Sequence, residues 1–151
     1  MKPETAVHQI MTTELITVRP ETAASQVKAI FDLHDFHHLP VVSEGNRLEG
    51  IISRKDFSKV AYVLSLNTSG RSYSEAAYEN LSASDFMTQY PVALDPEDSV
   101  GLAADIFMAN KFHALPIIEE AQLVGLITTH DLLLYSYQSP LSSEQASLEI
   151  Y

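Results

Sequence analysis

The alternation of apolar and polar residues predicts two short strands joined by a tight turn. Residues 39–42 are largely apolar, polar residues 44–46 follow, and residues 48–53 are again rich in apolar side chains. Branched apolar runs of this length around Glu44-Gly45-Asn46 are typical of a β-hairpin. A second hairpin with the same layout is predicted at residues 115–118 and 123–128.

Apolar residues at helical spacing predict a helix before each hairpin. Val27, Ile30 and Phe31 fall at i, i+3 and i+4, and residues 103, 106 and 107 repeat this apolar spacing. A short strand at residues 15–18, stopped by Arg19-Pro20, is expected before the first of these helices. Two more helices are expected at residues 56–66 and from residue 131 to about 137, each with an aspartate in the first turn, where the helix dipole favours it.

The chain therefore contains the same β-α-β-β-α pattern twice. Met11-Thr12 returns as Met87-Thr88 and Leu39-Pro40 returns as Leu115-Pro116, and the second copy lacks one residue in its hairpin turn. Each copy is too small to bury its own sheet well. We expect an α+β fold in which the two copies pack with approximate twofold symmetry and form two equivalent clefts.

Composition divides the chain into four segments. The first copy with its N-terminal segment covers residues 1–66, and the second copy covers residues 85–140. Residues 67–84 are rich in Ser, Gly and Asn, which predicts a linker with a short helix near residues 75–80. Residues 141–151 are polar and are expected to form a loose tail.

Charge and cysteine content exclude several classes of function. The 151 residues contain no cysteine, which excludes disulfides and thiolate chemistry. The formal net charge of −11 disfavours sequence-independent nucleic-acid binding. The chain shows neither an apolar run long enough to span a membrane nor a secretory signal pattern, so a cytoplasmic protein is expected.

The repeated motifs resemble the cystathionine β-synthase (CBS) domain. The segments that carry the resemblance are MTTELITVRP, HLPVV and GIISRKD in the first copy, and MTQYPVALDP, ALPII and GLITTHD in the second. Two such motifs in tandem are similar to the arrangement called a Bateman module. The resemblance implies a regulatory pair that binds AMP, ADP, ATP or S-adenosylmethionine, usually as a homodimer, and signals occupancy to a regulated partner protein. No cofactor is required for that role.

The chemistry of the Ser/Thr-x-x-Asp motif fits a nucleoside. The two oxygens of the Asp56 or Asp131 carboxylate are suited to accept hydrogen bonds from two neighbouring ribose hydroxyls. Ser53 and Thr128 lie where a strand passes into a helix, next to N–H groups that the helix leaves free to approach a phosphate or ribose oxygen. The same motif also caps helices without any ligand, and this interpretation stays open.

The residues inside the two motifs differ between the copies. Arg54 and Lys55 give the first copy two cations, whereas Thr129 and His130 give the second a hydroxyl and a group that titrates near neutrality. We therefore expect unequal sites. Exposed cations at a helix start are the plainer interpretation of Arg54 and Lys55.

The family resemblance further implies an adenine held between apolar side chains and recognised by the backbone of the first strand and of the segment before Leu-Pro. His38 is the departure from the pattern, because an imidazole could stack on a base or fill its place. The implied positions are Ile16, Thr17, His38 and Val41 in the first copy, and Val92, Ala93, Ala114 and Ile117 in the second.

Other interpretations compete with nucleotide binding. Clefts closed by their own side chains would make the chain a structural interaction module. His34, His37 and His38, with Asp35, form a rival metal site, but a helix end before Leu39-Pro40 would separate them. No independent catalytic signature is found, so an enzyme is not expected. The repeated prolines are interpreted either as edge-strand prolines or as recognition elements.

Overall fold

The computed structural model describes residues 1–66 and 71–138, with the side chains of residues 71–75 excepted. The predicted tail at residues 141–151 lies outside the described residues. Helices and strands are mixed along the chain, so the predicted α+β class is confirmed. Contacts divide the chain into two compact units, and the division does not follow the order of the sequence.

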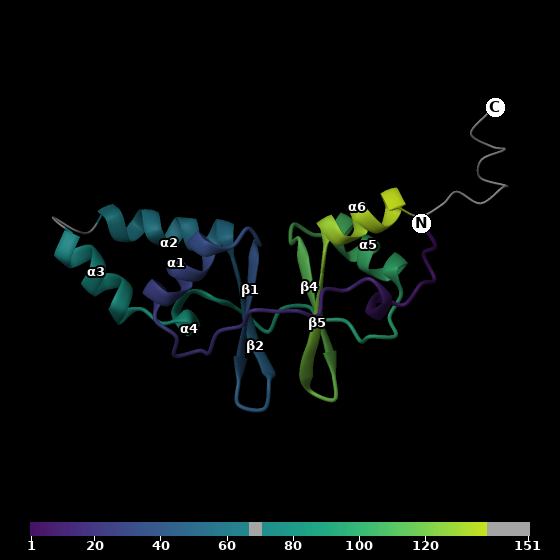
Figure 1. Ribbon diagram of the computed structural model, residues 1–151, viewed down its shortest axis with the longest axis horizontal. Coiled ribbons are helices and arrows are strands. Elements are labelled where there is room, and N and C mark those ends of the chain that lie inside the picture. The colour runs from purple at the N-terminus through teal and green to yellow at the C-terminus, as the bar shows by residue number, and fades with distance from the viewer. Residues whose placement is uncertain (67–70, 139–151) are drawn as a thin grey trace. The chain divides into compact units, whose positions relative to one another are not determined.

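One unit, called here the first-hairpin unit, consists of Leu15–Val92 together with Glu120–Leu123. Its sheet has the order β1-β2-β3, and its helices lie to one side of the hairpin (Figure 1). The elements are α1 (Ala24–Leu33), β1 (His38–Ser43), β2 (Arg47–Ser53), α2 (Arg54–Leu66), α3 (Arg71–Asn80), α4 (Ala83–Phe86) and β3 (Thr88–Gln89).

The other unit, called here the second-hairpin unit, consists of Met1–Glu14, Ala93–Glu119 and the described residues from Val124 onward. Strands β4 and β5 form its sheet, and α5 and α6 lie beside them (Figure 1). The elements are the 3-10 helix η1 (Val7–Gln9), α5 (Val100–Ala109), β4 (Ala114–Glu119), β5 (Gln122–Thr128) and α6 (Thr129–Gln138).

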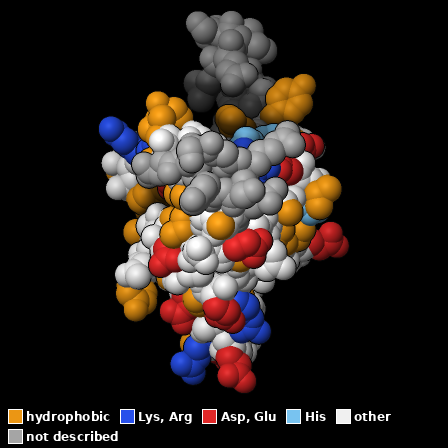
Figure 2. Space-filling view, turned by 90° about the vertical axis from the view of Figure 1, so that its left-hand side faces the viewer, with side chains coloured by type: hydrophobic (Ala, Val, Ile, Leu, Met, Phe, Trp, Pro, Cys, Tyr) orange, Lys and Arg blue, Asp and Glu red, His pale blue; other side chains and the backbone are white. Residues whose placement is uncertain are grey.

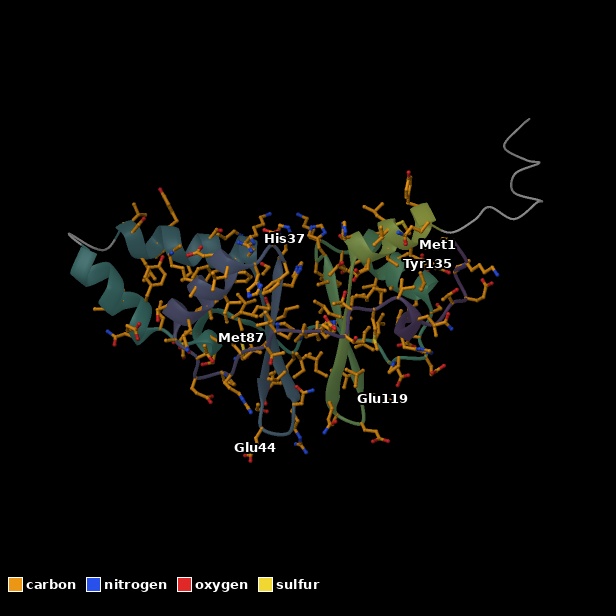
Figure 3. All side chains as sticks on the ribbon, viewed as in Figure 1. Met1, His37, Glu44, Met87, Glu119 and Tyr135 are labelled. Atoms are coloured by element: carbon orange, nitrogen blue, oxygen red, sulfur yellow. The ribbon has the colours of Figure 1, made fainter. Side chains whose placement is uncertain are left out.

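Both predicted hairpins are confirmed, and their turns differ in length. In the first, His38 pairs with Ser53 and Pro40 with Ile51. Figure 3 shows His37 and Glu44 at opposite ends of this hairpin. The turn between β4 and β5 contains only Glu120 and Ala121, whose φ angles are 50° and 65°. Two central residues with positive φ form the type I′ turn that suits a two-residue hairpin, which accounts for the missing residue.

The leading segment of each copy folds against the hairpin of the other copy. Val7 N–H donates to the Asp98 carbonyl at 2.8 Å, and Thr12 bridges Leu126. In the first-hairpin unit the equivalent Ala83 N–H donates to the Thr22 carbonyl at 2.8 Å, and β3 pairs with β2. The exchange is therefore reciprocal.

The two repeated glycines are explained by this exchange. A Cβ on Gly50 would lie 2.6 Å from Sδ of Met87 and 2.7 Å from the Thr88 carbonyl oxygen. A Cβ on Gly125 would collide in the same way with Sδ of Met11. Each glycine admits the methionine of the other copy's leading segment, at the point where that segment crosses the hairpin.

Each unit has its own hydrophobic core. The predicted helix positions Val27 and Phe31 are buried in one, and Ala103 and Phe107 in the other. Aromatic rings add to the first core, where Phe31 and Phe57 lie 5.7 Å apart. The shared feature of both cores is a helix packed on a buried hairpin, with a residue of the exchanged segment (Val7 or Ala83) enclosed.

The predicted strand at residues 15–18 is wrong. Only Val18 pairs with the sheet, through one parallel bridge to Val41. The second copy has a single parallel bridge as well, from Leu94 to Ile117. Proline at position 40 has no N–H to extend the ladder toward residue 16, so the bridge cannot lengthen into a strand.

Candidate functional site

The β2–α2 junction holds the first Ser/Thr-x-x-Asp motif. The Ser53 hydroxyl accepts a hydrogen bond from the Asp56 N–H at 3.0 Å and so caps the start of α2. The Asp56 side chain is 46% exposed, and its nearest cation is Lys59 at 3.9 Å. At that distance and exposure the ion pair contributes little. The Asp56 carboxylate is therefore available to an added ligand.

The β5–α6 junction holds the second motif, and there the fold uses both side chains. The Thr128 hydroxyl accepts from the Asp131 N–H at 3.1 Å, and the Asp131 carboxylate accepts from the Thr128 N–H at 2.9 Å. This is a reciprocal capping arrangement. Helix capping thus accounts for both Thr128 and Asp131 in the second motif. In the first motif it accounts for the Ser53 hydroxyl but not for the Asp56 carboxylate.

Arg54 is engaged by the fold. Its guanidinium donates to the carbonyls of His34 at 2.6 Å and Phe36 at 2.9 Å, and lies 4.9 Å from the ring centre of Phe31. A planar guanidinium suits this combined stacking and hydrogen bonding. Lys55 is exposed. Of the two predicted cations, Lys55 is the one without such backbone contacts.

The second copy has no guanidinium at the matching place. Thr129 occupies it, and its N–H donates to the His113 carbonyl at 3.0 Å, as the Arg54 N–H donates to the His37 carbonyl at 2.7 Å. His130 is exposed on the first turn of α6. The two junctions therefore share a backbone geometry and differ in charge.

The predicted base-contacting positions divide into exposed and buried residues. Ile16 and Val92, which are equivalent in the two copies, are apolar yet 39% and 51% exposed. Val41 and Ile117 are fully buried in the two cores, and Ala114 is buried as well. Side chains at Val41 and Ile117 are thus occupied by packing. Thr17, His38 and Ala93 are half-buried.

The first-hairpin unit brings most of the first-copy positions to one end of the hairpin. Val18, two residues after Ile16, bridges Val41 of β1. His38 lies opposite Ser53 on β2. His38 and Ser53 therefore lie at the end of the hairpin opposite the turn, and Asp56 follows on the first turn of α2.

Hydrogen bonding to Asp32 at 2.8 Å raises the pKa of Lys28, aided by the charge of that carboxylate, but this pair lies on the exposed face of α1. On the face shown in Figure 2, Lys and Arg side chains at the lower end lie beside Asp and Glu.

The metal alternative finds no support among the described residues. They contain no group of three His, Asp or Glu side chains placed to hold an ion. His34 stacks on Phe36 with ring centres 5.1 Å apart. Nor do the described residues include a helix long and apolar enough to cross a membrane.

A family model for the CBS domain matches residues 7–62 and 83–137. The chain belongs to the CBS domain family. Both copies of the repeat are covered, so the chain contains a tandem CBS pair, as the motifs predicted. CBS pairs with the same fold include CBSX2 in complex with AMP, with 21% identity and a TM-score of 0.73 over 88% of this chain and 96% of that one.

Two more solved structures are similar. The CBS domain of a membrane protein from Sphaerobacter thermophilus is 29% identical, with a TM-score of 0.71 over 87% of this chain and 88% of that chain. The CBS pair of MJ0100, in complex with 5′-methylthioadenosine and S-adenosyl-L-methionine, is 22% identical, with a TM-score of 0.71 over 91% of this chain and 100% of that chain.

Curated relatives include much longer proteins. The inosine-5′-monophosphate dehydrogenase of Korarchaeum cryptofilum is 29% identical over 120 residues, which are 79% of this chain and 22% of that protein. A CBS domain-containing protein of Dictyostelium discoideum is 28% identical over 134 residues, which are 84% of this chain and 88% of that protein. The chain spans less than a quarter of the dehydrogenases it matches, 22% and 24%.

The feature that sequence reasoning missed is that only Val18 of the first predicted strand bridges the hairpin. The sixteen predicted site residues rest on their side chains or on the resemblance, and their roles stay predictions. The structure adds that Val18 N–H donates to the Pro40 carbonyl at 3.1 Å and Val42 N–H donates to the Val18 carbonyl at 2.9 Å. The recurrence of proline at positions 40 and 116 was the available signal.

Proposed function

We propose that this CBS pair is a regulatory module that binds an adenosine-containing nucleotide at the end of the first hairpin. The observation that carries the proposal is the Asp56 carboxylate, which is half exposed at the start of α2 and has only a distant lysine as partner. An ionised carboxylate accepts strong hydrogen bonds from a pair of hydroxyls. Asp56 therefore binds the ribose diol.

The neighbouring groups fit the rest of a nucleotide. Ile16 presents an exposed apolar side chain two residues before the bridge from Val18 to β1, which suits a base on one side of the ribose. Lys55, exposed on the first turn of α2, is placed for a phosphate. Similar CBS pairs have been crystallised with AMP and with S-adenosyl-L-methionine, which supports the adenosyl class.

In this proposal the second copy binds the nucleotide more weakly than the first, or does not bind it. Asp131 is already an acceptor for the Thr128 N–H, so a ribose would compete with the helix cap. Occupancy of the first copy shifts the equilibrium between two arrangements of the protein, because only a difference in affinity between arrangements can do so. A regulated partner protein distinguishes those arrangements.

The oligomeric state proposed is a homodimer. Tyr62 on α2 and Tyr137 on α6, which are equivalent positions of the repeat, are among the exposed large apolar side chains, and Leu66 and Leu133 accompany them. A second copy would cover these side chains. Light scattering after gel filtration should give twice the 16.7 kDa mass.

Isothermal calorimetry with AMP, ADP, ATP and S-adenosylmethionine tests the function. The wild-type protein should bind at least one of them, and at a hundredfold the dissociation constant the ligand should stabilise it by about 2.7 kcal/mol. Asp56→Asn should weaken binding at least tenfold, whereas Glu44→Gln at the opposite end of the hairpin should not. Absence of binding by every adenosyl compound would favour an interaction module with ligand-free clefts.

A further inference from the structure

The loop that joins α1 to β1 consists of residues 34–37, and Arg54 binds most of its carbonyls. The guanidinium donates to the His34 carbonyl at 2.6 Å, and to the Phe36 carbonyl at 2.9 Å and 3.2 Å. The Arg54 backbone N–H donates to the His37 carbonyl at 2.7 Å. These hydrogen bonds from one residue fix the path of the loop, because a planar guanidinium can span two carbonyls at once.

The surroundings of Arg54 account for its charge within the fold. His34 is the C-terminal cap residue of α1, so the guanidinium lies at the negative end of that helix dipole. Cζ of Arg54 lies 4.9 Å from the ring centre of Phe31, which adds a cation–π contact. Phe31 is itself buried and lies 6.1 Å from Phe36 of the loop. The guanidinium is thus engaged by the loop and by the helix before it.

The loop borders the proposed nucleotide site. His38 follows the loop directly and pairs with Ser53 across the hairpin. Arg54 is the residue after Ser53, and Asp56 lies on the same first turn of α2. The guanidinium that orders the loop therefore also fixes the path of the chain into His38. A site that is ordered before its ligand arrives loses less conformational entropy on binding.

The second copy has the same aromatic residues without the guanidinium. Phe107 and Phe112 stand at the positions of the two phenylalanines that accompany Arg54. Thr129 stands at the position of Arg54, and its N–H donates to the His113 carbonyl at 3.0 Å. A threonine hydroxyl is a single donor and cannot span two loop carbonyls. The second copy therefore keeps the backbone hydrogen bond of this position and lacks the fork.

We propose that Arg54 is a positioning residue for the nucleotide site of the first copy, because it orders the loop at residues 34–37 and does not touch the ligand. This inference rests on the proposed nucleotide function. It separates the roles of two adjacent cations, since Lys55 is exposed and is the one placed for a phosphate. The two copies then differ in the order of this loop as well as in the hydrogen bonds of their aspartates.

Ligands with and without a phosphate distinguish positioning from phosphate binding. Arg54→Lys keeps the charge and loses the fork, so calorimetry should show adenosine and AMP weakened by the same factor, about tenfold. Lys55→Ala is the matched variant and should weaken AMP but not adenosine. Weaker binding of AMP with unchanged binding of adenosine in Arg54→Lys would show that Arg54 binds the phosphate, and would overturn the inference. Unchanged affinity for both ligands would overturn it as well.

Amide hydrogen exchange measures the order of the loop without any ligand. In Arg54→Lys the amides of residues 35–37 should exchange about tenfold faster than in Val100→Ala. Val100→Ala removes part of a fully buried side chain from the core of the other unit, so it lowers stability and leaves the loop contacts intact. Equal exchange in the two variants would overturn the inference, because Arg54 would then act only through global stability.

The second copy tests whether a guanidinium is sufficient to order the loop. Thr129→Arg supplies the fork beside Phe107, so the amides of residues 111–113 should exchange about tenfold more slowly than in Thr129→Lys, which adds only the charge. Equal exchange in these two variants would overturn the inference. A wild-type protein that binds no adenosyl compound, with a loop that loosens in Arg54→Lys, would instead overturn the proposed function and leave the role of Arg54 in the loop intact.

Discussion

The Thr128 N–H donates to the Asp131 carboxylate at 2.9 Å, and the Thr128 hydroxyl accepts from the Asp131 N–H at 3.1 Å. In the first copy, Ser53 accepts from the Asp56 N–H, but the Asp56 carboxylate accepts no hydrogen bond in return among the described residues. The carboxylates of two aspartates at equivalent positions of the repeat therefore differ in their hydrogen bonds. The Asp131 carboxylate completes a helix cap, and the Asp56 carboxylate does not.

Alanine substitution of each aspartate should therefore change the stability of the protein by different amounts. Asp131→Ala should lower the free energy of unfolding by about 1 kcal/mol, because the cap loses its carboxylate. Asp56→Ala should cost less than about 0.5 kcal/mol, as surface substitutions do, and should affect nucleotide affinity instead. Urea unfolding of both variants without nucleotide measures the difference. Equal destabilisation would show that Asp56 is also structural.

Alanine at the two repeated glycines should destabilise the protein to different extents. Gly50→Ala should destabilise by about 1–3 kcal/mol, because the new Cβ meets the Thr88 carbonyl oxygen as well as Met87. Gly125→Ala should cost less, since it meets only the side chain of Met11, and a thioether is flexible. Thermal unfolding of the two variants checks the order. The reverse order would show that Met11 cannot move.

Substitution of Arg54 should reveal a structural role. Arg54→Lys keeps the charge but loses the fork that spans two carbonyls, so unfolding should become easier by about 1–2 kcal/mol. Lys55→Ala, one residue along the same helix, should change stability by less than about 0.5 kcal/mol. Chemical denaturation measures both, and a neutral Arg54→Lys would contradict the assignment.

Relief of the backbone strain at Ala121, in the two-residue turn between β4 and β5, should stabilise the protein. Ala121 has a φ of 65°, which side chains disfavour. Ala121→Gly should raise the free energy of unfolding by about 0.5–1 kcal/mol, which corresponds to a melting temperature roughly 1–4 °C higher. Ala76→Gly, at an exposed position of helix α3, is the matched control and should lower stability. A lower melting temperature for Ala121→Gly would show that the turn is not strained.

Much of the fold was predictable because hydrophobic periodicity is a local property. Val27 and Phe31 are assigned to the core from their spacing alone, and both are buried. The strand at residues 15–18 failed because its pairing depends on a residue far along the chain, Pro40, which removes a donor from the ladder. A strand prediction from composition cannot include that distant partner.

The candidate site was predictable in part for the same reason. Asp56 and Asp131 look alike in sequence, and only the positions of neighbouring N–H groups distinguish them. The charge of Arg54 is visible in the sequence, but the carbonyls of His34 and Phe36, to which its guanidinium donates, have no signature there. The difference between the two aspartates and the contacts of Arg54 both depend on backbone groups, which the sequence does not place.

The reciprocal exchange of leading segments has a consequence for the folding reaction. A fragment ending at residue 66 would lack residues 81–90, which complete its sheet and contribute Ala83 to its core, and its own first fourteen residues would be stranded without a docking surface. Each half of the sequence thus supplies a segment that the sheet and core of the other half require, so severing the chain between its two repeats would yield two incomplete units.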